Sequence, residues 1–271
     1  MAFRRPYLGM TMPRYDFRTP RLYIEHPLAK GTGVPLDRDQ ANYLRNVLRL
    51  GQGDGVLLFN GRDGEWQATL AELSKKTLAA EIGELQRAQP RPQNLHFLFA
   101  PLKHARLDYM AQKAVEMGVS KLQPVITRHT QVARVNVERM HANAIEAAQQ
   151  CGVLSIPEVA EPVPFKALFR EADADRLLIF CDEDAEVKDP VAALVAARTA
   201  PSALLPAAAA GEARPMAVLI GPEGGFSEEE RAALAARPNV LRLSLGPRIL
   251  RADTAAVAAL ALVQAVLGDW A

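Results

Sequence analysis

Short apolar runs alternate with glycine-rich turns over the first third of the chain, a pattern typical of antiparallel β-structure. The runs that we expect to form strands are Leu22–Ile24, Val56–Phe59, Trp66–Leu70 and Thr77–Ile82. One apolar stripe at helical spacing interrupts them within Asp39–Leu50. The pattern predicts a small β-barrel with a single helix.

The hydrophobic period changes after Gln86–Gln93, a polar segment whose two prolines indicate a linker. Beyond it, apolar runs of strand length alternate with helical stripes. The strands are predicted at Leu95–Ala100, Lys121–Ile126, Arg176–Cys181, Ala217–Ile220 and Val240–Leu245. The helices are predicted around 107–115, from Asn136 onward, and at Val191–Ala197, Glu228–Ala236 and Thr254–Leu267. This alternation favours a mainly parallel sheet covered on both faces.

The expected organisation is therefore α/β, in three parts. Residues 1–17 form a loose N-terminal extension, residues 18–88 the β-barrel, and residues 93–271 the α/β domain. We interpret the Ala- and Pro-rich stretch 200–211 as a surface insertion without chemistry.

Charge is distributed unevenly along the chain, although its net value is only +1. Residues 1–50 carry nine Lys and Arg against four Asp and Glu, whereas residues 161–271 carry eleven against sixteen. The early excess favours docking of a polyanion. A chance distribution of solvated charge is the alternative.

Several classes of protein are disfavoured by composition. The longest apolar runs fall short of the roughly 18 residues that a membrane span needs. Cys151 and Cys181 make no disulfide framework, the five histidines show no metal-ligand spacing, and we expect no metal site. Both thiols are expected to be buried, and a reducing cytoplasm suits them.

The sharpest motif is the run Gly221-Pro222-Glu223-Gly224-Gly225, which follows an apolar strand and precedes a helix. Its glycines let backbone N–H groups approach a ligand closely. In an α/β sheet such a turn lies where ligands bind, beyond the carboxyl end of a strand. Ser227 and Glu230 have the spacing of a capping box at the helix start. The run matches neither the dinucleotide fingerprint nor the P-loop, so it points to another ligand.

A second strand ends in a similar turn, 243–256, which combines glycine, proline, two arginines and an acid before an Ala-rich helix. Asp253 or Thr254 is expected to cap that helix. Arg248 and Arg251 lie between predicted buried elements, where an unpaired charge is costly, and the arginine fork suits phosphate. Lys103 and Arg106 follow the first strand of the α/β domain, ahead of a helix whose polar side we interpret as a solvated face.

Together these motifs resemble the SPOUT-class methyltransferases that modify N3 of a uridine in bacterial small-subunit (16S) ribosomal RNA. The resemblance rests on four separated strings and covers about residues 18–270. They are Val47–Gly51 with Phe59–Gly61, Gln112–Val119, Gly221–Gly225 and Leu245–Ala256.

The resemblance implies a C-terminal SPOUT trefoil-knot domain, a PUA-like N-terminal barrel that holds RNA, a homodimer, and S-adenosylmethionine as the methyl donor. The pocket for this cofactor is expected at Leu219, Gly221, Pro222, Glu223, Gly224, Gly225, Leu243, Leu245, Gly246, Ile249 and Leu250. Catalysis is assigned to Arg248, Arg251 and Asp253, with the arginines stabilising the uracil or a phosphate and Asp253 accepting the proton or orienting them. The expected contacts to ribosomal RNA, on the small ribosomal subunit, are Arg21, Arg45, Arg49, Lys103 and Arg106.

Two departures from the family pattern leave alternatives open. Asp253 stands where the family commonly has Glu, and Gln149–Pro157 lacks the family's Glu and Arg, for which Arg128 and Arg134 are candidate replacements. The alternatives are a methyltransferase acting on another ribosomal or transfer RNA position, a catalytically inactive RNA-binding homologue, and an α/β enzyme acting on small molecules.

Overall fold

The computed structural model describes residues 16, 18–74, 77–132, 134–169, 176–186, 189–199 and 215–270. Most of the predicted extension and the whole predicted insertion at 200–211 lie outside these residues. The chain divides into two compact units between Pro90 and Arg91. Within the described residues, no helix has both the length and the apolar character needed to cross a membrane.

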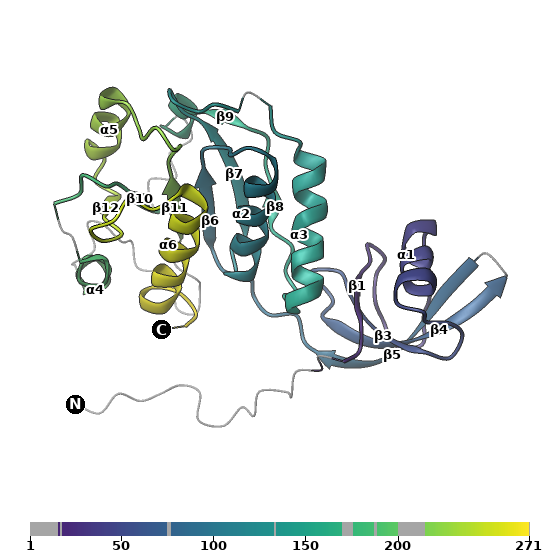
Figure 1. The fold of residues 1–271 in the computed structure, drawn as a ribbon. Coiled ribbons are helices and arrows are strands. Elements are labelled where there is room, and N and C mark those ends of the chain that lie inside the picture. The colour runs from purple at the N-terminus through teal and green to yellow at the C-terminus, as the bar shows by residue number, and fades with distance from the viewer. Residues whose placement is uncertain are drawn as a thin grey trace, which may run out of the picture. The chain divides into compact units, whose positions relative to one another are not determined.

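The N-terminal unit is built on a five-stranded sheet in the order β1-β3-β4-β5-β2. Its strands are β1 (Arg21–Tyr23), β2 (Gly33–Pro35), β3 (Gly55–Phe59), β4 (Glu65–Ser74) and β5 (Thr77–Arg87). The four predicted strands are confirmed, whereas β2 was not predicted, because three residues that include Gly and Pro carry no alternating pattern. Apolar side chains from the strands and from the helical segment pack into one core. Figure 1 shows the short helix of this unit beside the sheet.

The predicted helix of this unit is split in two. Helix α1 (Arg38–Asn42) begins at a capping box in which Asp37 and Gln40 bond each other's backbone N–H, and it continues as the π-helical segment Tyr43–Val47. The chain leaves this segment through Arg49, a non-glycine residue with φ of 58°.

The C-terminal unit contains a seven-stranded parallel sheet in the order β12-β10-β11-β6-β7-β8, with β9 also pairing β7. Its strands are β6 (Leu95–Phe99), β7 (Lys121–Ile126), β8 (Glu158–Val159), β9 (Val163–Pro164), β10 (Leu177–Cys181), β11 (Met216–Ile220) and β12 (Val240–Leu243). The predicted parallel sheet is confirmed. Only β8 and β9 were missed, since two-residue strands leave no periodicity to detect.

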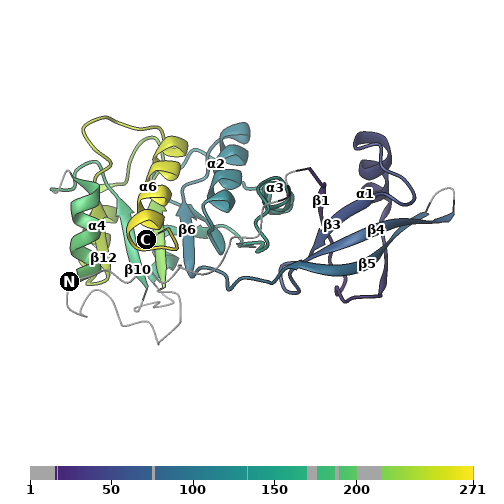
Figure 2. The ribbon, with the colours of Figure 1, turned by 90° about the horizontal axis from the view of Figure 1, so that it is seen from below.

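Five α-helices are described in this unit: α2 (His104–Glu116), α3 (Val137–Cys151), α4 (Pro190–Thr199), α5 (Glu228–Ala235) and α6 (Ala252–Val266). Helix α6 packs against α2, α4 and β11, and Figure 2 shows α4, α6 and α2 in a row along the sheet. The predicted cap of α3 is confirmed, since the Asn136 side chain accepts a hydrogen bond from Arg139 N at 2.9 Å.

The predicted start of α6 is wrong. Neither Asp253 nor Thr254 caps this helix, because it begins at Ala252 with Arg251 in the N-cap position and no side-chain cap. Asp253 therefore sits inside the first turn, where a carboxylate is favoured by the helix dipole.

Candidate functional site

A cavity of about 440 Å³ opens at the carboxyl ends of β10, β11 and β12. That volume lies within the range of small-molecule sites, and the place is where an α/β sheet is expected to bind a ligand. The cavity is lined by three stretches of the chain, 181–183, 220–226 and most of 243–255, with Asp253 not among the lining residues. Every residue predicted for the cofactor lines it except Leu219, which is buried inside β11.

The first turn of the cavity owes its shape to close packing beneath Gly221. A Cβ atom at this position would lie 2.4 Å from Cε2 of Phe226. The Phe226 ring is itself buried and meets Phe180 edge-on, at 4.9 Å between ring centroids, and Phe165 at 6.2 Å. Glycine at 221 therefore lets the backbone lie directly on a fixed aromatic ring.

The predicted capping box behind this turn is confirmed. Glu230 is buried, and its carboxylate accepts hydrogen bonds from Ser227 N at 2.9 Å and from Arg128 N at 2.8 Å. The Ser227 hydroxyl accepts from Glu230 N at 3.3 Å. The Glu230 side chain thus connects the start of α5 to the segment that follows β7.

The second turn exposes its charged residues instead of burying them. Gly246 has φ of 97°, Ile249 is 94% exposed, and Arg248 and Arg251 are exposed on the rim of the cavity. The expectation that both arginines lie among buried elements is wrong, because the loop between β12 and α6 projects outward. Their position at the rim leaves both guanidinium groups accessible to a substrate.

Arg106, near the start of α2, joins the two turns. Its Nε and Nη2 atoms donate to the two carboxylate oxygens of Asp253, each at 3.1 Å, and its Nη1 donates to Glu223. The hydrogen bond from Arg106 lowers the pKa of both Asp253 and Glu223, and these bonds raise the pKa of Arg106. Asp253 is therefore held as a carboxylate that orients Arg106, not the exposed arginines.

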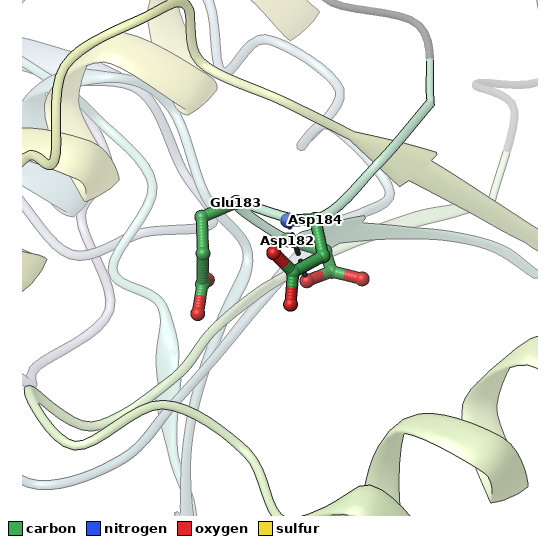
Figure 3. A group of neighbouring side chains, drawn as sticks. All are labelled: Asp182, Glu183 and Asp184. Carbon is green, nitrogen blue, oxygen red and sulfur yellow. Dashed lines mark hydrogen bonds between the residues drawn. The ribbon is translucent and has the colours of Figure 1, made fainter.

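A buried carboxylate, Asp182, is among the residues that line the cavity. Asp182, whose side chain is fully buried, accepts hydrogen bonds from Arg242 at 2.6 and 2.9 Å and from Arg231. Figure 3 shows it beside Glu183 and Asp184 on the segment after β10. Arg231 also contacts both of those acids. Since the two arginines offset the acidic charge, we interpret this group as an ion-pair network that ties β10, β12 and α5 together.

The predicted RNA contacts are placed unevenly. Lys103 and Arg49 are exposed, and Arg45 is paired with Glu72 at 2.9 Å. The Arg21 side chain is 6% exposed and donates to Glu65, which Arg87 also binds. Arg21 therefore stabilises the N-terminal sheet, and its burial argues against a phosphate contact.

A smaller cavity of about 140 Å³ was not predicted. Pro222 and Glu223 line it together with Lys103, Arg106, His129 and Gln131. His129 is exposed, and its Nδ1 lies 3.1 Å from Gly225 O. The sequence offered no signal for His129, because it follows a strand without any motif around it.

The two cysteines differ from each other. Cys151 is exposed at the end of α3, so the prediction of a buried thiol is wrong there. Cys181 ends β10 at the wall of the large cavity, and burial raises the pKa of its thiol to about 12.

Comparisons with known proteins agree on one family. The model of an RNA methyltransferase domain matches residues 89–264, and that of an RNA methyltransferase PUA domain matches residues 36–83. Ribosomal RNA small subunit methyltransferase E of Rickettsia conorii is 30% identical, over 90% of this chain and 94% of that protein.

Two solved structures share the fold. A putative methyltransferase of Legionella pneumophila, in complex with bound S-adenosylmethionine, is 32% identical with a TM-score of 0.75, over 92% of this chain and 98% of that one. Ribosomal RNA small subunit methyltransferase E of Neisseria gonorrhoeae, bound to S-adenosylmethionine, is 27% identical with a TM-score of 0.77, over 93% and 100%.

Proposed function

We propose that this chain methylates ribosomal RNA of the small subunit, with S-adenosylmethionine as the methyl donor. The chain belongs to the RNA methyltransferase family, as the ribosomal RNA small subunit methyltransferase E proteins do. The observation that carries the proposal is the large cavity. It lies at the carboxyl ends of β10, β11 and β12, in a fold whose relatives from Legionella and Neisseria bind S-adenosylmethionine.

The residues of the cavity fit this cofactor. Its volume of about 440 Å³ suits a nucleoside-sized ligand, and much of its lining comes from residues of the two glycine-containing turns. Backbone N–H and C=O groups in such turns can bind an adenine and a ribose without side chains in the way. The bound cofactor supplies an electrophilic methyl group on a sulfonium, which needs no metal.

We further propose that the methylated atom is N3 of a uridine and that the substrate is the assembled small subunit. N3 of uracil carries a proton at neutral pH, so its methylation requires a proton acceptor and stabilisation of the developing charge. We assign that stabilisation to Arg248 and Arg251 at the rim of the cavity, and we assign to Asp253 the orientation of Arg106. A target base within a helix would be turned out of its stack.

We also propose contacts to RNA phosphates. Lys103 and Arg49 are exposed, and Arg45 is partly exposed on the π-helical segment. Arg106 is not included among these contacts, because it pairs with Glu223 and Asp253 of the two turns. Such contacts release counterions, so RNA binding should weaken steeply as salt rises.

The architecture around the site is part of the same proposal. We propose that 18–88 is the RNA-binding PUA-like domain, that 93–271 is the SPOUT domain, and that its C-terminal part forms a trefoil knot. We further propose a homodimer in the cytoplasm. Ile249, which lines the cavity, and Tyr109 on α2, the helix that carries Arg106, are large apolar side chains that are exposed, and they support a subunit interface, because aromatic and apolar anchors are typical of such surfaces.

The test is to incubate the purified protein with labelled S-adenosylmethionine and small subunits that lack the modification, and then to identify the labelled nucleoside. N3-methyluridine is the expected product. Label in another nucleoside would move the target to a different RNA position. No label, and no binding of the cofactor in calorimetry, would favour a catalytically inactive RNA binder, which the family arginine missing after Gly152 also favours.

A further inference from the structure

The smaller cavity lies against the same turn as the large one. Pro222 and Glu223 line both cavities, so the two cavities adjoin along this segment. Its volume of about 140 Å³ equals that of roughly five waters in the liquid, which suits one flat ring and not a whole nucleotide. The cavity is open to solvent at the exposed residues Lys103 and Gln131.

The polar lining of this cavity matches the edge of a pyrimidine. Lys103 brings an ammonium donor and Gln131 an amide, which can donate and accept. Arg106 is already occupied by Glu223 and Asp253. The cavity therefore offers donors for ring carbonyl oxygens, together with the imidazole of His129.

The contact of His129 with Gly225 determines which ring nitrogen holds a proton. A carbonyl oxygen only accepts, so the Nδ1 that lies 3.1 Å from Gly225 O must be the donor. In the neutral imidazole the other nitrogen, Nε2, then carries a lone pair and accepts. The backbone thus orients His129 as a base, in the way that a buried acid orients histidine in hydrolases.

We propose that the smaller cavity binds the target pyrimidine ring and that His129 Nε2 removes its N3 proton. The inference rests on the proposed function, because it assigns the proton acceptor of the same methyl transfer. The proton moves from N3 to Nε2, and the imidazolium later releases it to water. The N3 lone pair forms the bond to the methyl carbon as the carbon–sulfur bond breaks, and the sulfur keeps that electron pair. The Lys103 ammonium has three N–H donors, so beside its phosphate contact it can also donate to a ring oxygen and offset the negative charge that develops there.

His129 is surrounded by charges of both signs. On the side of the smaller cavity it faces Lys103, Arg106 and Glu223, of which the last two are paired with each other. On its other side, an open hollow is lined by Arg128, Lys166, Glu228 and Glu229. The hydrogen bond from Ser227 is the main reason that the pKa of Glu229 is lowered, and the charge of Arg128 contributes less.

A purely structural role for His129 makes a different prediction. The residue packs on the turn, since a Cβ atom at Gly224 would lie 3.3 Å from His129 Cβ. His129→Asn keeps a short side chain with an N–H donor for Gly225 O but has no basic nitrogen. If His129 only braces the turn, the Asn variant should behave like wild type, whereas His129→Ala should not.

The experiment measures single-turnover methylation of unmodified small subunits by wild type, His129→Asn and His129→Ala, with cofactor binding followed by calorimetry. We expect both variants to lose roughly 10²–10⁴-fold in rate, with the dissociation constant of His129→Asn for the cofactor within about twofold of wild type. The rate of His129→Asn should rise steadily in alkaline solution, where hydroxide removes the N3 proton, while wild type stays level. Nitrogen NMR of the wild-type imidazole, without cofactor, should show Nδ1 protonated and Nε2 free.

The outcomes separate this inference from the proposed function. If wild type forms N3-methyluridine and His129→Asn forms it equally fast, the inference is overturned and the proposed function stands. A proton on Nε2 of the neutral ring also overturns it. Wild type that methylates no small-subunit RNA overturns the proposed function, and the inference with it.

Discussion

The contact between Gly221 and Phe226 predicts a measurable cost for one added methyl group. In Gly221→Ala, the new Cβ would lie 2.4 Å from Cε2 and 2.9 Å from Cδ2 of Phe226. The ring cannot turn aside freely, because Phe180 and Phe165 pack against it and it is 6% exposed. The backbone of the turn must therefore move away from the ring.

The magnitude follows from the cost of overpacking, about 1–3 kcal/mol. In a unit of this size each kcal/mol lowers Tm by about 2–4 °C, so a decrease of about 2–12 °C is expected by calorimetry. The displaced turn lines the large cavity, and we expect S-adenosylmethionine to bind at least about tenfold more weakly, which is ~1.4 kcal/mol.

Two further variants make the test specific. Gly51→Ala is the control, since nothing lies within 4 Å of the added Cβ and its φ is not positive; its Tm and cofactor affinity should match wild type. Phe226→Leu makes room beneath position 221, so the double variant should be more stable than the sum of the two single effects, with a coupling of about 0.5–3 kcal/mol. An unchanged Tm and affinity in Gly221→Ala, or strict additivity in the double variant, would refute the reasoning.

Three other predictions concern the ion pairs and the proposed RNA contact. In Arg106→Ala, Asp253 loses the hydrogen bond that lowers its pKa, so its titration midpoint in carboxyl NMR should rise, and methylation should slow with little change in Tm; an unmoved midpoint would contradict the pairing. Burial alone would raise the pKa of Glu65, but the hydrogen bonds from Arg87 and Arg21 outweigh it and lower the pKa; the stabilisation is therefore complete above the usual carboxyl pKa and is lost as pH falls through the folded value. Glu65→Ala should lower the free energy of unfolding in urea by about 3–5 kcal/mol at neutral pH, and the difference from wild type should be smaller in acid. Equal stability of the two proteins at neutral pH would show that the ion pairs of Glu65 contribute nothing. Lys103→Ala should reduce the slope of RNA affinity against salt by about one ion, as measured by filter binding, and a slope equal to that of wild type would exclude a phosphate contact.

Local spacing along the chain was sufficient for most of the longer strands and helices and for the capping box behind the first turn. Short apolar runs predicted β3, β4, β10 and β11, and the serine and glutamate at 227 and 230 predicted the capping box, because each depends on residues fewer than about a dozen apart. The two glycine-containing turns line one cavity, as the family resemblance implied, and the parallel strands that precede them end at the same edge of the sheet.

Tertiary packing decided which charged groups meet. Arg106 lies 117 residues from Glu223 and 147 from Asp253, and sequence spacing alone says nothing about pairs so far apart. The same limit explains why Arg21 was expected on phosphate but pairs with Glu65, and why His129 went unnoticed. A sequence states which residues can carry charge or form a turn, whereas the partner of each charge depends on how distant strands and helices are brought together in the core.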